Sequence, residues 1–118
     1  MNQADRMTVP YDRTCAVVDL DAVCHNMEAM KSLPEGTGMI GVVKTDAYGH
    51  GAEAVADAID PYVIGFAAAT ADEGILLRRY GITKPVLILG PVHESRYEEL
   101  VLEEIRPVIF TKEAAAAF

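Results

Sequence analysis

The chain has 118 residues, of which 51% are hydrophobic and 24% are charged. These proportions are typical of a single globular unit and exclude a disordered or collagen-like chain. Ten basic and eighteen acidic side chains give a net charge of -8. A nucleic-acid partner is therefore not expected, because binding to its phosphates needs a basic face.

The sequence also predicts no membrane-spanning helix, since no apolar run approaches the ~18 residues that such a helix needs. Residues Met1–Arg6 lack the basic segment and apolar core of a secretory signal, so we expect a cytoplasmic protein with no membrane partner. Cys15 and Cys24 are too few for a disulfide framework and lack the spacing of metal ligands, so no metal site is predicted. We expect both to be reduced thiols packed inside the protein.

The first predicted elements precede Pro34. Residues 1–13 are polar and irregular and are expected to form a flexible arm. Thr14–Leu20 is rich in β-branched and apolar residues, which predicts a strand. Asp19 or Asp21 can cap a helix that follows, because an aspartate there accepts a hydrogen bond from the first turn. The apolar positions of this helix recur at helical spacing and are Val23, Met27 and Met30.

Four short apolar runs recur at nearly regular intervals along the rest of the chain. They are Met39–Val43, Tyr62–Phe66, Val86–Leu89 and Pro107–Phe110, centred on Val42, Ile64, Ile88 and Ile109. Each run is apolar with little interruption, a pattern typical of strands that are buried on both faces. Each is therefore predicted to be one strand of a sheet.

Segments with helical periodicity lie between these runs. The first has a single apolar face, formed by Ala52, Val55, Ala56 and Ile59. The second begins with Thr70–Glu73, which has the spacing of a capping box, and ends near Tyr80-Gly81. These signals predict a helix after each of the first two runs.

The third helical segment begins at Ser95–Glu98 with the same capping-box spacing and is expected to bury Leu100 and Val101. A further helix start is indicated at Glu113–Phe118. Strands and helices thus alternate along residues 21–118, which predicts an α/β fold with a parallel sheet. A (β/α)8 TIM-type barrel needs eight strands and about 250 residues. We therefore expect the first half of such a barrel, as a fragment of a longer protein.

The segment Val43–Gly51 carries the least ordinary chemistry of the chain. Active sites of parallel α/β folds lie at the carboxyl ends of strands, and Lys44 directly follows the first of the four runs. Removal of a lysine from water favours its neutral, nucleophilic amine, which suits a Schiff base with an aldehyde such as pyridoxal phosphate. Tyr48 can donate a hydrogen bond to a phosphate, and Gly49 and Gly51 allow a sharp turn close to a ligand.

Each of these side chains also has a simpler interpretation. Lys44 can be a solvated cation at the end of a strand, and Tyr48 can pack at the start of a helix. His50 can form a structural hydrogen bond, and Asp46 can stabilise an Asx turn. Neither His50 nor Asp46 is assigned a catalytic role.

The whole string Val43–Gly51, with the sequence Val-Lys-Thr-Asp-Ala-Tyr-Gly-His-Gly, resembles the cofactor-attachment signature of bacterial alanine racemases. The likeness extends over residues 14–118. The other similar segments are Ala16–Val23 with Asn26, Phe66–Gly74 and Pro85–Gly90. Thr45 departs from the alanine that the family more often has, although a small side chain is kept.

This resemblance implies a fold-type III enzyme that uses pyridoxal 5'-phosphate. Such an enzyme has a (β/α)8 barrel and a β-rich C-terminal domain, which the predicted strand Thr14–Leu20 would join. The resemblance implies that Lys44 holds the cofactor as a Schiff base and is one of two acid/base groups. It also implies that Tyr48 donates a hydrogen bond to the cofactor phosphate and that Leu89 lies against its pyridine ring.

The implied reaction interconverts L-alanine and D-alanine and supplies D-alanine for bacterial peptidoglycan. The second base would be a tyrosine from the partner subunit of a homodimer, and an arginine would face the pyridine nitrogen. Neither of these two groups is expected within this sequence. We therefore expect the 118 residues to be inactive on their own.

Three other functions share features with the sequence. The segment Gly49–Ala54 fits the G-x-G-x-x-A fingerprint of dinucleotide-binding oxidoreductases. However, residues Lys44–Tyr48 separate it from the preceding strand, and the second predicted strand does not end in the acidic residue that binds the ribose. A non-catalytic pyridoxal phosphate-binding homeostasis protein would carry the same lysine on a single barrel. A serine-preferring racemase would share the whole segment. A β-rich C-terminal segment with a tyrosine base would favour an enzyme over the carrier.

Overall fold

The computed structural model describes residues 14–32 and 36–118. The flexible arm predicted for residues 1–13 lies outside this range. Residues 14–19 form neither helix nor strand, and Leu20 is the first residue of helix α1 (Leu20–Lys31). Leu20, the last residue of the predicted strand, is therefore helical. Pairing of the remaining residues with a β-rich domain stays a prediction.

Helix α1 begins at one of the two predicted caps. The carboxylate of Asp19 accepts a hydrogen bond from the backbone N–H of Ala22 at 3.1 Å. Along the helix, Met27 is buried and Val23 packs against the core, as predicted. Met30 is 46% exposed, so its predicted inward position is wrong. Helix α1 packs against α3 and η2.

The two cysteines differ in their surroundings. Cys24 is partly buried, and its thiol donates a hydrogen bond to the carbonyl oxygen of Ala58 at 3.5 Å. Cys15 is exposed on the segment that precedes α1, so the prediction of a packed thiol is wrong for this residue. Both are free cysteines.

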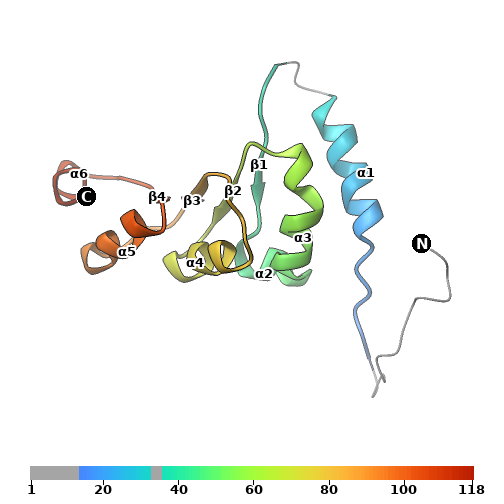
Figure 1. Ribbon diagram of the computed structural model, residues 1–118, viewed down its shortest axis with the longest axis horizontal. Helices are drawn as coiled ribbons and strands as arrows, with labels where there is room; N and C mark the ends of the chain where they lie inside the picture. Colours follow the sequence, from blue (N-terminus) through green and yellow to red (C-terminus); the bar gives the residue numbers. More distant parts are fainter. Residues whose placement is uncertain (1–13, 33–35) are drawn as a thin grey trace.

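The predicted parallel sheet is confirmed. Its four strands follow one another in space in the same order as in the sequence, and each pairs in parallel with the next (Figure 1). The strands are β1 (Ile40–Val42), β2 (Gly65–Ala68), β3 (Val86–Ile88) and β4 (Ile105–Pro107).

Two of the predicted strands are displaced along the chain. The second was expected at Tyr62–Phe66, but Asp60–Tyr62 forms the 3-10 turn η2, in which Pro61 lies in the first turn, where proline is tolerated. The fourth was expected at Pro107–Phe110, but the strand begins at Ile105, which is 2% exposed and pairs with Val86. Consequently two predicted strand centres, Ile64 and Ile109, are exposed residues outside the strands.

Helices connect the strands, as the alternating pattern predicts. They are α2 (Lys44–Gly49), α3 (Ala52–Ile59), α4 (Ala71–Arg79), α5 (Tyr97–Leu102, preceded by the 3-10 turn η3, Glu94–Arg96) and α6 (Lys112–Ala117). The predicted apolar face of α3 is confirmed, because its four members are all buried. In the described part of the chain, no helix is long and apolar enough to cross a membrane.

One of the two predicted capping boxes is present. The Thr70 hydroxyl accepts a hydrogen bond from the N–H of Glu73, whose carboxylate accepts one from the N–H of Thr70. The box predicted at Ser95–Glu98 is wrong, because the His93 ring accepts the hydrogen bond from the Ser95 N–H and starts the turn two residues earlier. In the helix that follows, the predicted burial is confirmed for Leu100 and wrong for Val101, which is 54% exposed.

One face of the sheet is covered by helices. Gly41, Phe66, Val86 and Ile105 occupy one row across the four strands. A methyl group added at Gly41 would lie 2.7 Å from Ile59 of α3, and Ile105 lies against Gly74 of α4, so both helices pack on this face. The opposite face carries the apolar side chains of Ile40 and Val42, which are 43% and 40% exposed.

Candidate functional site

The candidate site lies at the carboxyl edge of the sheet. Lys44 comes two residues after the end of β1, follows the buried Val43 and is itself half-buried. The hydrogen-bond ladder continues past the ends of the strands, because the Val43 N–H donates to Ala67 and the Leu89 N–H donates to Ala68, both at 2.9 Å. Lys44 and Leu89 therefore lie at the same edge, with the end of β2 between them.

The backbone after Lys44 forms a left-handed helical turn, although it contains no glycine until Gly49. Thr45, Asp46, Ala47 and Tyr48 all have φ between 50° and 57° and ψ between 34° and 50°. A left-handed conformation costs about 1–2 kcal/mol for each residue with a side chain, because Cβ crowds the following carbonyl. A run of four such residues is therefore a strained segment, and strain of this kind occurs at functional sites.

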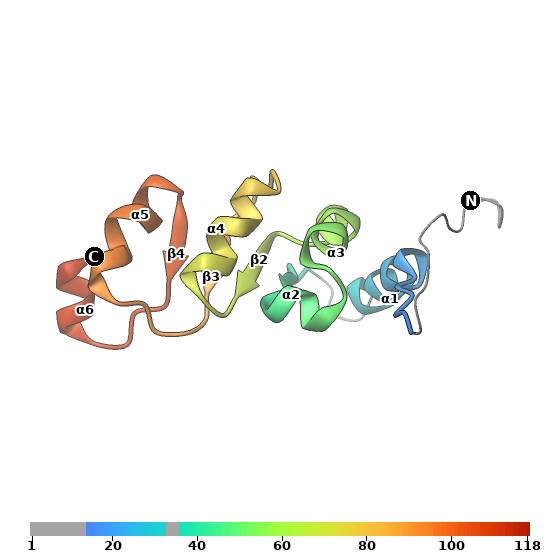
Figure 2. The same ribbon diagram turned by 90° about the horizontal axis from the view of Figure 1, so that it is seen from below.

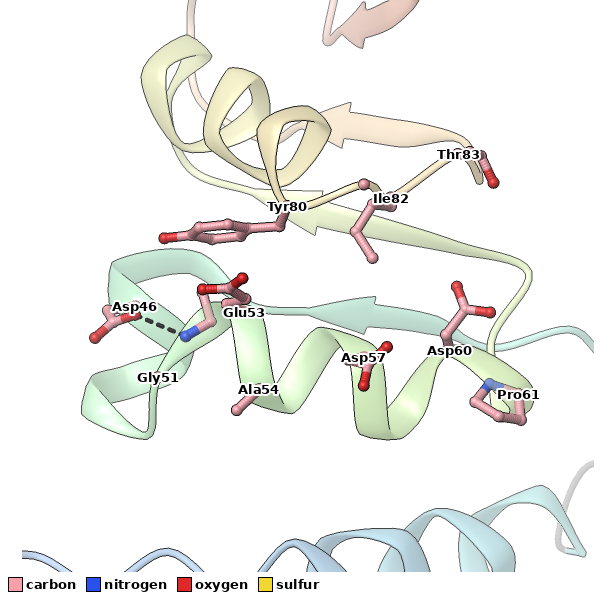
Figure 3. A pocket seen from close by; sticks show the side chains of 12 residues that line it. Asp46, Gly51, Glu53, Ala54, Asp57, Asp60, Pro61, Tyr80, Ile82 and Thr83 are labelled. Carbon is pink, nitrogen blue, oxygen red and sulfur yellow. Dashed lines mark hydrogen bonds between the residues drawn. The ribbon is translucent and has the colours of Figure 1, made fainter.

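Local hydrogen bonds stabilise the left-handed turn. The N–H of Ala47 donates to the carbonyl of Val43 at 2.9 Å. A carboxylate oxygen of Asp46 accepts a hydrogen bond from the N–H of Ala52 at 2.6 Å and so caps α3 (Figure 3). The Nδ1 atom of His50 lies 2.9 Å from the carbonyl oxygen of Ala47, to which it can only donate. These contacts give both residues structural roles. The structural hydrogen bond expected of His50 is present, whereas Asp46 caps α3 through a residue six positions on and does not form the expected Asx turn.

The turn brings Lys44 and Tyr48 together. The ammonium nitrogen of Lys44 lies 5.9 Å from the centre of the Tyr48 ring, within the range of a cation–π contact. Tyr48 is 60% exposed, so its phenol is open to a ligand at this edge. Leu89, the third predicted site residue, is 44% exposed on the far side of β2. Lys44 and Leu89 thus lie on either side of the end of β2, and the Tyr48 ring lies beside the Lys44 amine.

Glu73 joins this turn to the next strand–helix loop, a contact that the sequence does not reveal. One carboxylate oxygen accepts a hydrogen bond from the N–H of Thr45 at 2.8 Å. The other accepts from the N–H groups of Ala69 at 2.7 Å and Thr70 at 3.2 Å. The capping-box spacing predicts only the bond to Thr70, because the partner on the turn lies 28 residues away in sequence.

A wide groove that begins at the left-handed turn and runs along α3 does not suit a phosphate. It has a volume of about 820 Å³ and lies between α3 and the end of α4 (Figure 3). Its α3 side carries the carboxylates of Glu53 and Asp57, and Asp46 and Asp60 stand at its ends. Asp60 pairs with Lys84, but the other three carboxylates repel an anionic ligand. The carboxyl edge with Lys44 is therefore the better site for a phosphate-bearing cofactor.

Comparison with known proteins identifies the fold and its family. A family model described as "Alanine racemase, N-terminal domain" matches residues 18–118. The chain belongs to this alanine racemase family. An alanine racemase of Geobacter sp. (strain M21) is 42% identical over 106 residues, which are 88% of this chain and 28% of that protein. The chain therefore spans less than a third of the length of this relative.

Solved structures place the four-stranded sheet within an alanine racemase fold. The crystal structure of alanine racemase from Bacillus anthracis with bound L-Ala-P matches with a TM-score of 0.79 and 36% identity, over 84% of this chain and 26% of that one. A histidine racemase from Leuconostoc mesenteroides matches with a TM-score of 0.78 and 26% identity, over 83% of this chain and 27% of that one. The parallel α/β unit thus corresponds to the N-terminal half of the racemase barrel, as the sequence predicts.

Proposed function

We propose that the protein carrying this sequence is an alanine racemase that binds pyridoxal 5'-phosphate through Lys44. The observation that carries the proposal is the position of Lys44 at the carboxyl edge of a racemase-family sheet, with its amine 5.9 Å from the Tyr48 ring. Membership of the family and the 42% identity to an alanine racemase support the reaction. The whole reaction remains a proposal, because this chain covers 28% of that relative.

The residues at this edge fit the cofactor chemically. The Lys44 amine can bond to the aldehyde, and the exposed Tyr48 phenol can donate a hydrogen bond to the phosphate. The strand between Lys44 and Leu89 ends in Ala67-Ala68 and is followed by Ala69, and these three side chains are small. We propose that Leu89 lies against the pyridine ring of the cofactor, since its side chain is apolar and 44% exposed.

Lys44 carries the acid/base chemistry of this chain in the proposed mechanism. When bound, pyridoxal phosphate supplies an electron sink that makes the Cα proton of an attached amino acid removable. With the cofactor bound, the Lys44 amine would accept that proton or return it on one face of the substrate. Tyr48 holds the phosphate end and so limits the movement of the substrate relative to Lys44.

Inversion at Cα needs a second acid/base group on the opposite face. We propose that this group is a tyrosine of the partner subunit in a homodimer and that an arginine faces the pyridine nitrogen, both outside this sequence. The exposed apolar face of the sheet, which includes Ile40 and Val42, is compatible with further protein covering it. The proposed product is D-alanine for peptidoglycan, made in the cytoplasm.

A racemisation assay of the complete gene product tests this function. We expect conversion of L-alanine to D-alanine, loss of conversion in Lys44→Ala, and unchanged conversion in Lys112→Ala, which removes an exposed lysine on α6. Serine and histidine serve as competing substrates, since one structural relative is a histidine racemase. Conversion of alanine that survives in Lys44→Ala would contradict the proposal, and a preference for serine or histidine would contradict its choice of substrate.

A further inference from the structure

We propose that Glu73 is a positioning residue for Lys44. It holds the left-handed turn in the conformation that places the Lys44 amine beside Tyr48. This inference rests on the proposed role of Lys44, and it concerns a side chain on the neighbouring helix α4. The capping box explains one hydrogen bond of the Glu73 carboxylate, but two further bonds lie outside the box.

The carboxylate of Glu73 accepts three backbone N–H groups from two loops. The N–H of Thr45 belongs to the turn after β1, whereas those of Ala69 and Thr70 belong to the turn after β2. An ionised carboxylate forms shorter and stronger hydrogen bonds than a neutral acceptor does. One side chain therefore fixes the separation of the two loops at the carboxyl edge of the sheet.

The bond to Thr45 acts on the peptide unit next to Lys44. The Thr45 nitrogen is bonded to the carbonyl carbon of Lys44, so a fixed Thr45 N–H fixes the plane of this peptide. That plane determines ψ of Lys44, and the left-handed conformation begins at the next residue. Rotation of this peptide would redirect the chain that carries Tyr48 and change the distance between its ring and the amine.

The left-handed turn borders a cavity as well as the core. A cavity of about 310 Å³ lies behind it, lined by Val43, Asp46, Glu73, Leu76, Leu77 and Tyr80 among others. The four left-handed residues favour a return to right-handed backbone. The hydrogen bonds from Ala47 to Val43 and from Ala52 to Asp46 hold the turn itself and its junction with α3. The hydrogen bond from the Thr45 N–H to Glu73 is the contact that ties the start of the turn to α4.

Two variants distinguish a Glu73 that only caps α4 from a Glu73 that also positions Lys44. Glu73→Gln keeps the size of the side chain but has one acceptor oxygen and one NH2 group, so it cannot accept from both loops. Thr70→Ala removes the other half of the same capping box and leaves the Thr45 bond untouched. The second variant is therefore the matched control for loss of the cap.

The test compares these variants in the complete gene product. In the protein without cofactor, we expect faster hydrogen exchange at the Thr45 amide in Glu73→Gln than in Thr70→Ala. With cofactor, we expect kcat for racemisation to fall by roughly 10- to 100-fold in Glu73→Gln, with a much smaller change in KM. Thr70→Ala should change neither quantity beyond about twofold if the cap stabilises without positioning. Equal effects of the two variants on Thr45 exchange and kcat would overturn the inference.

Two further measurements separate failure of this inference from misfolding of a variant and from failure of the proposed function. If Glu73→Gln does not fold, as circular dichroism would show, Glu73→Asp replaces it, because its shorter carboxylate cannot reach both loops at the present distances. If the unaltered protein does not attach pyridoxal phosphate at Lys44, the proposed function fails. The exchange rate at Thr45 then still decides whether Glu73 holds the turn.

Discussion

The amine of Lys44 lies 5.9 Å from the centre of the Tyr48 ring, although the backbone that joins the two residues is left-handed throughout. In a right-handed helix, residues four apart also lie on one face, but the chain would enter and leave the turn in other directions. The left-handed turn places both side chains at the edge of the sheet, and α3 begins after it. The strained backbone is therefore part of how the site is built.

Tyr48→Phe is expected to weaken cofactor binding without unfolding the protein, because Tyr48 is exposed and its ring is retained. Loss of one hydrogen bond costs about 0.5–1.5 kcal/mol, and up to about 3 kcal/mol when the acceptor is charged, as a phosphate is. Equilibrium dialysis of pyridoxal phosphate measures the change. Tyr97→Phe is the control, since Tyr97 packs against Phe118 at the other end of the molecule. An unchanged dissociation constant in Tyr48→Phe would remove Tyr48 from the phosphate site.

Thr45→Gly is expected to stabilise the protein by up to about 1 kcal/mol, because glycine adopts the left-handed conformation without the crowding of Cβ. The substitution keeps the N–H that binds Glu73. Ala54→Gly, at an exposed position of the right-handed helix α3, is the control and should destabilise by about 1 kcal/mol. Urea unfolding measures both changes. Destabilisation of similar size in the two variants would show that the turn is not left-handed in solution.

The sequence predicts the sheet and the helix order well because both depend on local patterns. The apolar face of α3 and the capping box at Thr70 and Glu73 each lie within a single element, and both are present. The end of the chain is predicted less well, since Phe110 is as apolar as a core residue but is 66% exposed. An apolar residue is part of a strand here where a helix packs against it, as α4 packs against Ile105.

The candidate site is predicted only in part, and its shape is not. The motif predicts that Lys44 and Tyr48 lie near one another, and the positive φ of Gly49 and Gly51 agrees with the predicted turn. The left-handed run has no signal in the sequence, because it is formed by residues that rarely adopt this conformation. The contact between Thr45 and Glu73 joins residues on separate elements, so only the folded chain reveals it.

The contact between Tyr62 and Glu28 predicts a dependence on high pH. The Tyr62 hydroxyl donates a hydrogen bond to the Glu28 carboxylate at 3.1 Å and joins η2 to α1. This bond, followed by partial burial and the charge of Glu28, raises the pKa of Tyr62 above its ordinary value of about 10. A raised pKa means that the stabilising contact is fully present below about pH 10 and is lost as the pH rises through the raised value.

The control for this dependence is Tyr62→Phe, which removes the ionisable group. We expect the free energy of unfolding of the unaltered chain to fall more steeply above about pH 10 than that of the variant. In an ultraviolet titration, the unaltered chain should have one tyrosine that ionises at higher pH than the others, and this tyrosine should be missing from Tyr62→Phe. Identical titration curves in their late phase would contradict the hydrogen bond to Glu28.

The most direct measurement is the location of the attached cofactor. The complete gene product is incubated with pyridoxal phosphate, reduced with borohydride and digested, and the modified lysine is identified by mass spectrometry. Lys84, which binds the carbonyl of Val63 and pairs with Asp60, and the exposed Lys112 provide internal comparisons. We predict modification of Lys44 at a stoichiometry close to one per chain, lost in Lys44→Ala. Equal labelling of all three lysines, or labelling that persists in Lys44→Ala, would contradict a cofactor site at the end of β1.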